Sequence, residues 1–262
     1  MDLQLGGKTA LITGSQRGTG EIIARTLAVE GVKVLVHSNE PNLEDNVADT
    51  IDHARAIYGD VRTEAGCDEV LAQILELVGG VDILINNYGA AEMNTWLDSS
   101  TQDWLDSYQL NVLSAVRLAQ GLVPEMCTQG WGRIIQLGTI GSHQPNNIMP
   151  QYYAAKGALA TMGVSLAKEL SGTGITVNTV SPGLIHTAEL ETAYRARAAK
   201  KGWGDDWEGI VQHLVKEDYP NPCERIAARE EVADAVVFLC SPRAGFINGQ
   251  NLRVDGGAVR YV

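Results

Sequence analysis

Short runs of branched apolar residues alternate with longer amphipathic stretches along most of this 262-residue chain. Short, near-continuous apolar runs are typical of strands that are buried on both faces of a sheet. The stretch from Gly20 to Glu30, in contrast, places Ile23, Leu27 and Glu30 at helical spacing. Strand–helix alternation of this kind predicts the α/β class, with one doubly wound parallel sheet and helices on both of its faces.

The expected elements cover the chain without a linker between them. We expect strands at Thr9–Thr13, Val32–His37, Val81–Asn87, Arg133–Leu137 and Ile175–Val180, and helices at about 20–30, 64–78, 101–126, 152–170 and 230–239. Because no repeat or Pro/Gly/Ser-rich tract divides the chain, residues 1–262 are expected to form a single domain. A charged insertion at about 188–229 holds Trp203, Trp207 and Tyr219. It is a candidate lid over a substrate, and the alternative is a surface insertion without function.

The composition excludes several classes of function. Twenty Lys and Arg against 32 Asp and Glu give a formal net charge of −12, which argues against a nucleic-acid or anionic-membrane surface. The four cysteines form no CxxC pair and the five histidines show no metal-ligand spacing, so we expect reduced thiols and no catalytic metal. Without a run of about 18 apolar residues or a signal pattern, a soluble, cytoplasmic protein is expected.

A glycine-rich turn follows the first expected strand and leads at once into a helix. It reads Thr13-Gly14-Ser15-Gln16-Arg17-Gly18-Thr19-Gly20. Glycines permit a tight turn and let backbone N–H groups approach a pyrophosphate at the N-terminus of a helix. The strand–turn–helix context near the start of the chain therefore predicts a dinucleotide site.

The residues after the second strand bear on which dinucleotide binds. That strand ends His37-Ser38-Asn39, and no acid occurs before Glu40. An acid at this place would bind the adenosine ribose of NAD, whereas a nearby arginine favours the 2′-phosphate of NADP. Arg17 in the turn therefore favours NADP, although Glu40 or a backbone contact could support NAD.

Tyr152 and Lys156 lie four residues apart at the start of an expected helix, so their side chains share one face. A free tyrosine is a poor acid–base catalyst at neutral pH because its pKa is about 10. A neighbouring ammonium would favour the phenolate and lower this pKa. Tyr153 has Gly157 at the corresponding position and cannot form the same pair.

Together these motifs resemble those of the short-chain dehydrogenase/reductase family over essentially the whole chain. TGSQRGTG is similar to the family's TGxxxGxG motif, Asn86-Asn87-Tyr88-Gly89 to NNAG, Tyr152-xxx-Lys156 to YxxxK, and Ser181-Pro182-Gly183 to its PG motif. Asn111 matches the family's helix asparagine, and the segments NGQ at 248–250 and VDGG at 254–257 match its ending. The resemblance implies a Rossmann-like fold and an NAD(P)-dependent oxidoreductase that interconverts a secondary alcohol and a ketone.

The resemblance also implies roles for individual residues. Tyr152 would exchange a proton with the substrate oxygen, Lys156 would hold the nicotinamide ribose, and Asn111 would anchor a water in a proton relay. Asp60 and Val61 would contact the adenine, Asn87 and Gly89 the middle of the nucleotide, and Ile185 and Thr187 the carboxamide. The implied cofactor-binding set is Gly14, Ser15, Arg17, Gly18, Thr19, Gly20, Ser38, Asp60, Val61, Asn87, Gly89, Tyr152, Lys156, Pro182, Gly183, Ile185 and Thr187.

The chain departs from the family pattern at two positions. Thr139 stands where the family usually has the serine that hydrogen-bonds the reacting oxygen. Threonine keeps the hydroxyl group, so we expect Thr139 to fill this role, with Ser142 as the rival. Tyr88 stands where alanine is common, and its ring either packs beside the strand end or lines the wall of the site.

Several functions remain open at this point. Within the dehydrogenases, a 3-oxoacyl reductase, a small-alcohol or diol dehydrogenase, and a steroid or terpenoid dehydrogenase are all compatible with the sequence. The tryptophans of the insertion indicate a bulky or cyclic substrate, and its acids argue against a highly anionic one. A nucleotide-binding sensor with weak turnover, and a dehydratase or epimerase on the same fold, are the alternatives. The resemblance also implies a homotetramer.

Overall fold

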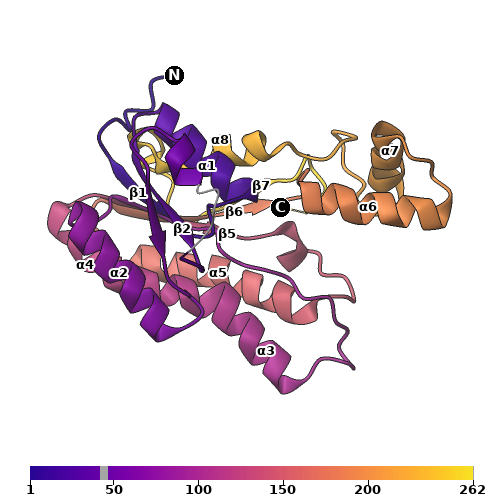
Figure 1. The fold of residues 1–262 in the computed structure, drawn as a ribbon, viewed down its shortest axis with the longest axis horizontal. Coiled ribbons are helices and arrows are strands. Elements are labelled where there is room, and N and C mark those ends of the chain that lie inside the picture. Colours follow the sequence, from indigo (N-terminus) through magenta and orange to yellow (C-terminus); the bar gives the residue numbers. More distant parts are fainter. Residues whose placement is uncertain (42–46, 262) are drawn as a thin grey trace.

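Seven parallel strands form one sheet within residues 1–41 and 47–261, which the computed structural model describes (Figure 1). The strands are β1 (Thr9–Ile12), β2 (Lys33–Ser38), β3 (Arg55–Tyr58), β4 (Ile83–Asn86), β5 (Gly132–Leu137), β6 (Ile175–Pro182) and β7 (Asn251–Val254). Their order is β3-β2-β1-β4-β5-β6-β7, and all six pairings are parallel. The predicted Rossmann-like parallel sheet is confirmed. The strand order reverses between β1 and β4, and such a switch point is where open α/β sheets bind ligands.

Helices cover both faces of the sheet, as predicted. The helices of the described residues are α1 (Gly18–Val29), α2 (Glu64–Val78), α3 (Thr101–Tyr108), α4 (Ser114–Gln129), α5 (Pro150–Glu169), α6 (Ala188–Lys201), α7 (Trp207–Glu217) and α8 (Arg229–Cys240), of which α6 and α7 lie outside the two layers. In β4, Ile83 and Ile85 pack on the side of α1 and α8, whereas Leu84 packs on the side of α2 and α4. Because both faces are buried, the central strands read as continuous apolar runs.

The structure differs from the sequence-based expectation at the two edges of the sheet and within one helix. Strands β3 and β7 were not predicted, because edge strands bury little: β3 contains one buried residue, Ile57, and β7 contains none. The helix expected over 101–126 is interrupted by a π-helical segment, Gln109–Leu113, between α3 and α4. This irregular turn holds Asn111, and π-helical turns frequently occur at functional sites.

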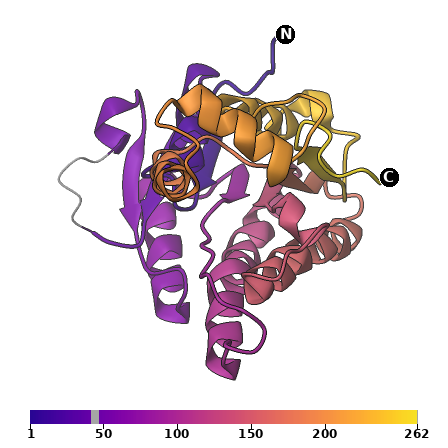
Figure 2. The same ribbon diagram turned by 90° about the vertical axis from the view of Figure 1, so that its right-hand side faces the viewer.

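The insertion forms a helical hairpin, α6 and α7, that stands apart from the sheet in Figure 1 and lies in front of it in Figure 2. Ala198, Ile210 and Leu214 form a small core of its own. Trp203 stacks on His213, with ring centroids 4.9 Å apart, and Trp207 stacks on His186 at 5.2 Å. The two tryptophans that indicated a bulky apolar substrate are therefore engaged in packing within the insertion.

The helices within the described residues include none that is long and apolar enough to cross a membrane.

Candidate active site

The predicted site residues gather where the parallel strands end. Gly14 follows β1, Ser38 ends β2, Asp60 follows β3, and Asn87 follows β4. Thr139 follows β5 in the same way, and Gly183 follows β6. Parallel pairing places the carboxyl ends of all these strands on the same side of the sheet, so residues far apart in the sequence become neighbours.

The glycine-rich turn has the geometry of a phosphate-binding loop. Gly14 and Gly18 adopt φ angles of +60° and +64°, which side-chain-bearing residues rarely adopt. A Cβ at Gly20 would lie 2.5 Å from the Asn87 amide nitrogen and 2.6 Å from the Gly14 carbonyl oxygen. Helix α1 begins at Gly18, and its N-cap residue, the exposed Arg17, makes no capping side-chain bond. The first N–H groups of α1, including that of Thr19, thus fit a pyrophosphate.

Two residues of the predicted cofactor set hold the turn in place. The Ser15 hydroxyl donates to the Ile12 carbonyl at 2.7 Å and accepts from the His37 N–H at 3.0 Å, and the Ser15 N–H donates to the His37 carbonyl. The Asn87 amide donates to the carbonyl oxygens of Thr13 and Gly14 at 2.9 and 3.0 Å. The polar donor groups of Ser15 are therefore used within the protein, and contact between Ser15 and the cofactor stays a prediction.

The residues expected near the adenine are also engaged with the protein. The Asp60 carboxylate accepts two bonds from the Arg62 guanidinium at 2.8 and 2.7 Å, and these bonds lower the pKa of Asp60. The Val61 side chain is fully buried in the core, which leaves only its main chain to meet an adenine. The Ser38 hydroxyl accepts a bond from the Glu40 N–H at 3.1 Å.

The Tyr88 ring packs beside the end of its strand and also borders the glycine-rich turn. The Tyr88 N–H donates to the Thr13 hydroxyl at 2.9 Å, and the ring packs partly against the core on the α2 side. A Cβ at Gly14 would lie 3.0 Å from the Tyr88 ring, so the ring forms a wall of the glycine-rich turn. The Tyr88 hydroxyl accepts a hydrogen bond from the Asn39 amide, and burial raises the pKa of Tyr88. Tyr88 thus reaches from the end of β4 to the end of β2.

Gly89, Asn111 and Lys156 meet at one point beside Tyr152. A Cβ at Gly89 would lie 2.6 Å from Asn111 Oδ1 and 2.8 Å from Lys156 Nζ, so a side chain at this position would displace the ends of both side chains. Lys156 is buried and donates to the Leu137 carbonyl at 2.8 Å, and its Nζ lies 6.0 Å from the centre of the Tyr152 ring. The structure brings together the YxxxK pair and the helix asparagine as expected.

Asn111 presents a buried acceptor at this point. Its Nδ2 donates to the carbonyl oxygens of Ala90 and Ser107, both at 3.0 Å, which fixes the orientation of the amide. Its Oδ1 is buried and has no hydrogen-bond partner among residues 1–41 and 47–261. A buried acceptor without a partner is costly, so this oxygen fits a bound water or ligand hydroxyl.

Burial dominates the protonation of the Tyr152–Lys156 pair. Burial and the neighbouring Tyr153 raise the pKa of Tyr152 to about 12, and burial lowers the pKa of Lys156 to about 8. The net shift in the pKa of Tyr152 is therefore upward, opposite to the direction expected from the Lys156 ammonium alone. Removal from water disfavours the ionised phenolate, and the Lys156 ammonium lies 6.0 Å from the centre of the Tyr152 ring.

The hydroxyl groups of Thr139 and Ser142 differ in what they can still donate to. Thr139 Oγ1 accepts a bond from the Gly141 N–H at 3.1 Å, which leaves the hydroxyl hydrogen available to donate. The rival Ser142 instead donates its hydroxyl hydrogen to the Thr139 carbonyl at 2.7 Å. A Cβ at Gly141 would overlap the ring of Tyr153, so the loop after β5 packs directly on α5. Gly141 was not predicted, and only this close approach reveals its role.

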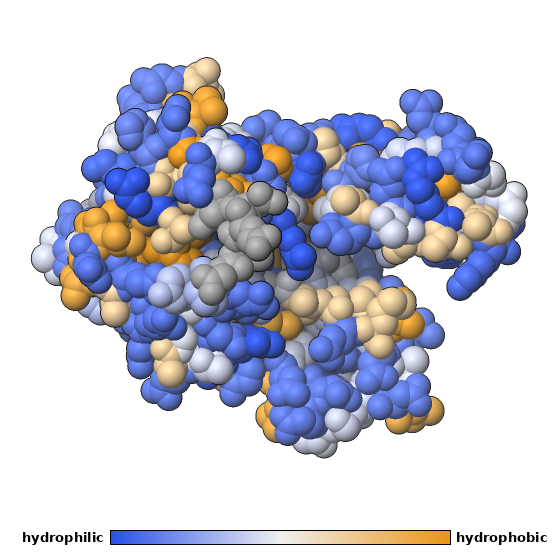
Figure 3. All heavy atoms as spheres, in the orientation of Figure 1, coloured by the Kyte–Doolittle hydropathy of each residue, from blue (hydrophilic) through white to orange (hydrophobic). Residues whose placement is uncertain are grey.

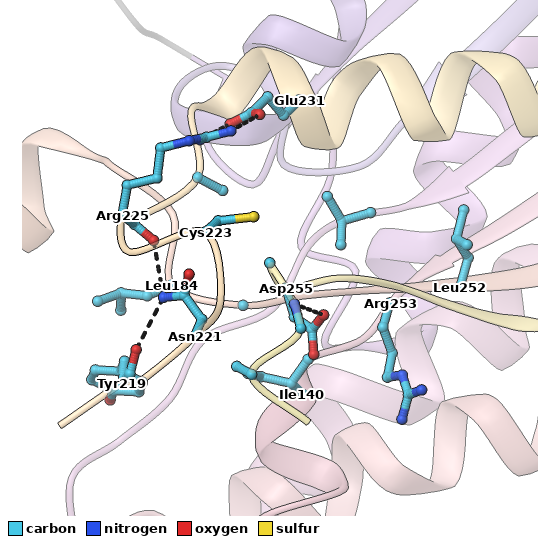
Figure 4. A pocket seen from close by; sticks show the side chains of 16 residues that line it. Ile140, Leu184, Tyr219, Asn221, Cys223, Arg225, Glu231, Leu252, Arg253 and Asp255 are labelled. Carbon is cyan, nitrogen blue, oxygen red and sulfur yellow. Dashed lines mark hydrogen bonds and ion pairs between the residues drawn. The ribbon is translucent and has the colours of Figure 1, made fainter. Parts of the chain in front are cut away.

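A cavity of about 370 Å³ opens next to the loop of Thr139 (Figure 4). Its lining includes Ile140, Leu184, Tyr219, Asn221 and Asp255. The segment that follows β6 runs past this cavity. Pro182 is buried at the end of the strand, and the Gly183 N–H donates to the Val254 carbonyl at 2.9 Å. Further along, Ile185 pairs with Ala227 in an isolated β-bridge, and the Thr187 hydroxyl caps α6. Figure 3 shows the surface hollowed between the α6–α7 hairpin and the part of the molecule beneath it.

His37 is a residue that the sequence did not single out. It lies at the end of the site where the dinucleotide is predicted to bind, between the glycine-rich turn and residues 59–61. Its side chain is fully buried and forms hydrogen bonds with Gly14 and Gly59. In the sequence it reads only as the last residue of an expected strand, and no local pattern distinguishes it.

Comparisons with known proteins agree with this geometry. A family model described as enoyl-(acyl carrier protein) reductase matches residues 14–259. The oxidoreductase YvaG of Bacillus subtilis is 36% identical over 100% of both chains, and the 3-oxoacyl-(acyl-carrier-protein) reductase of Escherichia coli is 34% identical over 96% of this chain and 97% of its own. The crystal structure of L-sorbose reductase from Gluconobacter frateurii, complexed with NADPH and L-sorbose, has a TM-score of 0.93 and 35% identity, with 100% of both chains covered.

The lowered pKa of Lys156 predicts a pH-dependent stability difference. Between pH 8 and about 10.5 the unfolded chain keeps a proton on Lys156 that the folded chain has lost, so unfolding becomes harder as the pH rises. Denaturant unfolding at pH 7 to 10 should therefore show the stability of the wild type rising relative to that of Lys156→Met. The exposed Lys168 on the same helix provides the control. Lys168→Met should show a constant difference, and a constant difference for Lys156→Met would contradict the prediction.

Proposed function

Because the chain belongs to the short-chain dehydrogenase/reductase family, it is an NAD(P)-dependent oxidoreductase acting between an alcohol and a carbonyl group, and we propose that Tyr152 is its general acid. The observation that carries the proposal is the convergence of Asn111 Oδ1 and Lys156 Nζ on Gly89, beside Tyr152. The nicotinamide supplies the hydride when bound.

The protein's own groups supply the proton and hold the substrate oxygen. With a pKa of about 12, Tyr152 is protonated at neutral pH and can donate to the oxygen of a ketone. Thr139 donates a second hydrogen bond to the same oxygen, and Lys156 orients the nicotinamide ribose. A water bound to Asn111 Oδ1 would pass a proton from solvent to Lys156, and Lys156 would return it to Tyr152 after each turnover.

The proposed cofactor is NADP, bound along the carboxyl ends of the strands. The N–H groups of Gly18, Thr19 and Gly20 receive the pyrophosphate, Gly14 lines the same turn while its own N–H stays bonded to His37, and the exposed Arg17 meets the 2′-phosphate. Binding of NADPH by the L-sorbose reductase that resembles this chain supports this preference. Further contacts are proposed for Ser15, Ser38, Asp60, the main chain of Val61, Asn87, Gly89, Pro182, Gly183, Ile185 and Thr187.

The proposed substrate is a small ketone that carries hydroxyl groups. The cavity beside Ile140 and Leu184 has room for a small molecule and presents polar side chains from Tyr219, Asn221 and Asp255 (Figure 4). The tryptophans of the insertion stack on histidines, which removes the main argument for a bulky apolar substrate. L-sorbose, the ligand of a structure similar over the whole chain, is a polyhydroxylated ketone. The α6–α7 hairpin is proposed to cover this substrate.

The proposed assembly is a homotetramer in the cytoplasm. Exposed apolar side chains on and before α3, including Trp96, Leu97 and Leu105, support a contact between subunits. All four cysteines are free thiols, as expected for a reducing compartment. Sedimentation of the purified protein tests the assembly.

Tyr152→Phe should abolish ketone reduction while NADPH binding persists, because the substitution removes only the hydroxyl that gives the proton. A fall in kcat by a factor of about 10² to 10⁴ is expected, with the cofactor Kd measured by fluorescence titration. Tyr153→Phe, which changes the adjacent tyrosine in the same way, is the control and should retain turnover. Equal losses in the two variants would contradict the assignment, and a wild type without redox turnover would favour the nucleotide sensor.

Thr139→Ala should lower kcat by about 10²-fold, the typical cost of losing one donor to the reacting oxygen. Ser142→Ala should leave kcat close to that of the wild type, because the Ser142 hydroxyl donates to the Thr139 carbonyl. Steady-state kinetics on the same ketone compare the two variants. The opposite order of effects would assign the role to Ser142.

A panel of ketones, assayed with NADPH and with NADH, should give the highest kcat/KM for hydroxylated ketones with NADPH. The panel includes ketoses, acetoacetyl thioesters and cyclic apolar ketones, which separate the substrate classes left open by the sequence. Arg17→Ala should raise KM for NADPH and leave KM for NADH nearly unchanged, because only NADPH carries the 2′-phosphate. A wild type that prefers NADH would refute the role of Arg17, and a preference for thioesters would refute the substrate class.

A further inference from the structure

His37 connects two segments that are not adjacent in the sequence and that both belong to the nucleotide end of the site. The Gly14 N–H donates to His37 Nδ1 at 3.0 Å, and His37 Nε2 lies 2.9 Å from the Gly59 carbonyl oxygen. Gly14 belongs to the glycine-rich turn after β1, and Gly59 immediately precedes Asp60 after β3. The imidazole ring therefore spans from one segment to the other across the end of β2.

The hydrogen bonds determine the form of the imidazole. A backbone N–H can only donate and a carbonyl oxygen can only accept, so Nδ1 is unprotonated and Nε2 carries the proton. Only the neutral ring with this tautomer satisfies both partners. Burial lowers the pKa of His37 to about 4, which keeps the ring neutral at physiological pH.

The surroundings of His37 hold the ring in one position. Its side chain is fully buried, and its main-chain N–H and carbonyl are both bonded to Ser15. The Tyr88 ring contacts it edge-on, with ring centroids 6.4 Å apart. Gly14 is thus enclosed between the imidazole of His37 and the ring of Tyr88.

The second segment has little freedom of its own. The Gly59 N–H donates to the Ser38 carbonyl at 3.1 Å, and a Cβ at Gly59 would lie 2.4 Å from the Gly66 carbonyl oxygen in α2. A shift of Gly59 would also move Asp60, the next residue. The backbone of Asp60 packs closely on Gly66, because a Cβ at Gly66 would lie 2.2 Å from the Asp60 carbonyl oxygen. Because the 59–61 segment is held by these contacts, tilting or losing the imidazole would displace the glycine-rich turn relative to it.

We propose that His37 is a positioning residue for the dinucleotide: its imidazole sets the spacing between the glycine-rich turn and the 59–61 segment, and thereby the affinity for the pyrophosphate and adenosine half of the cofactor. This inference rests on the proposed placing of the nucleotide along these two segments. His37 does not touch the reacting atoms, which lie at Tyr152. Its loss should therefore change cofactor affinity much more than kcat at saturating cofactor.

The experiment uses the full chain and measures binding of ADP-ribose, which carries the pyrophosphate and adenosine but no nicotinamide. His37→Phe removes both hydrogen bonds and should weaken ADP-ribose and NADPH binding by about 10-fold or more. His37→Asn places an amide oxygen near the position of Nδ1 and should recover part of this loss. Amide hydrogen exchange of the unliganded protein should become faster at residues 13–18 in His37→Phe and less so in His37→Asn.

Leu35→Ala is the matched control for a general loss of stability. Leu35 is buried on the same strand, two residues before His37, and belongs to the core on the α2 side. It should lower the free energy of unfolding without changing the Kd for ADP-ribose.

Two results would overturn the proposal: unchanged ADP-ribose affinity in both His37 variants, or an equal loss of affinity in Leu35→Ala. If His37→Phe does not fold, His37→Asn and its exchange pattern decide between these outcomes. ADP-ribose binding that depends on His37, in a protein that reduces no ketone, would refute the proposed reaction and leave the positioning role standing.

Discussion

Parallel pairing of neighbouring strands is the constraint on which the rest of the structure depends. It places the carboxyl ends of the seven strands in the described residues on one side of the sheet. Segments that are far apart in the sequence therefore contribute to one site. The reversal of strand order between β1 and β4 leaves the glycine-rich turn and the Asn87–Gly89 segment side by side there. Apolar side chains of the helices pack on both faces of the sheet and hold the carboxyl ends of the strands in place.

Close approach between glycine and functional side chains is the second theme of the site. Gly20 lets Asn87 reach the turn, Gly89 lets Asn111 approach Lys156, and Gly141 lets the loop of Thr139 rest on Tyr153. In each case a single Cβ would force apart groups whose contact defines the site. These glycines are required by packing rather than by backbone conformation, since none of the three has a positive φ.

Desolvation, rather than charge attraction, governs the ionisable groups at the two ends of the site. Burial raises the pKa of Tyr152 and lowers those of Lys156 and His37, so all three favour their neutral forms more than they would in water. For Tyr152 a neutral phenol is a proton donor, and for His37 a neutral ring can accept from Gly14 while it donates to Gly59. One physical effect thus serves proton transfer at one end and nucleotide positioning at the other.

The sequence by itself determined the class of fold, the glycine-rich turn and the pairing of Tyr152 with Lys156 on one helix. These features depend on spacings within a few residues or on the two-sided burial of central strands, and both leave a local pattern. Only the tertiary structure decided that Ser15 holds the turn, that His37 connects Gly14 to Gly59, and that Tyr88 reaches Asn39. It also reversed the expected direction of the Tyr152 pKa shift. Hydrogen bonds between distant segments and the loss of water around a buried group depend on how the whole chain packs, and neighbouring residues in the sequence do not encode them.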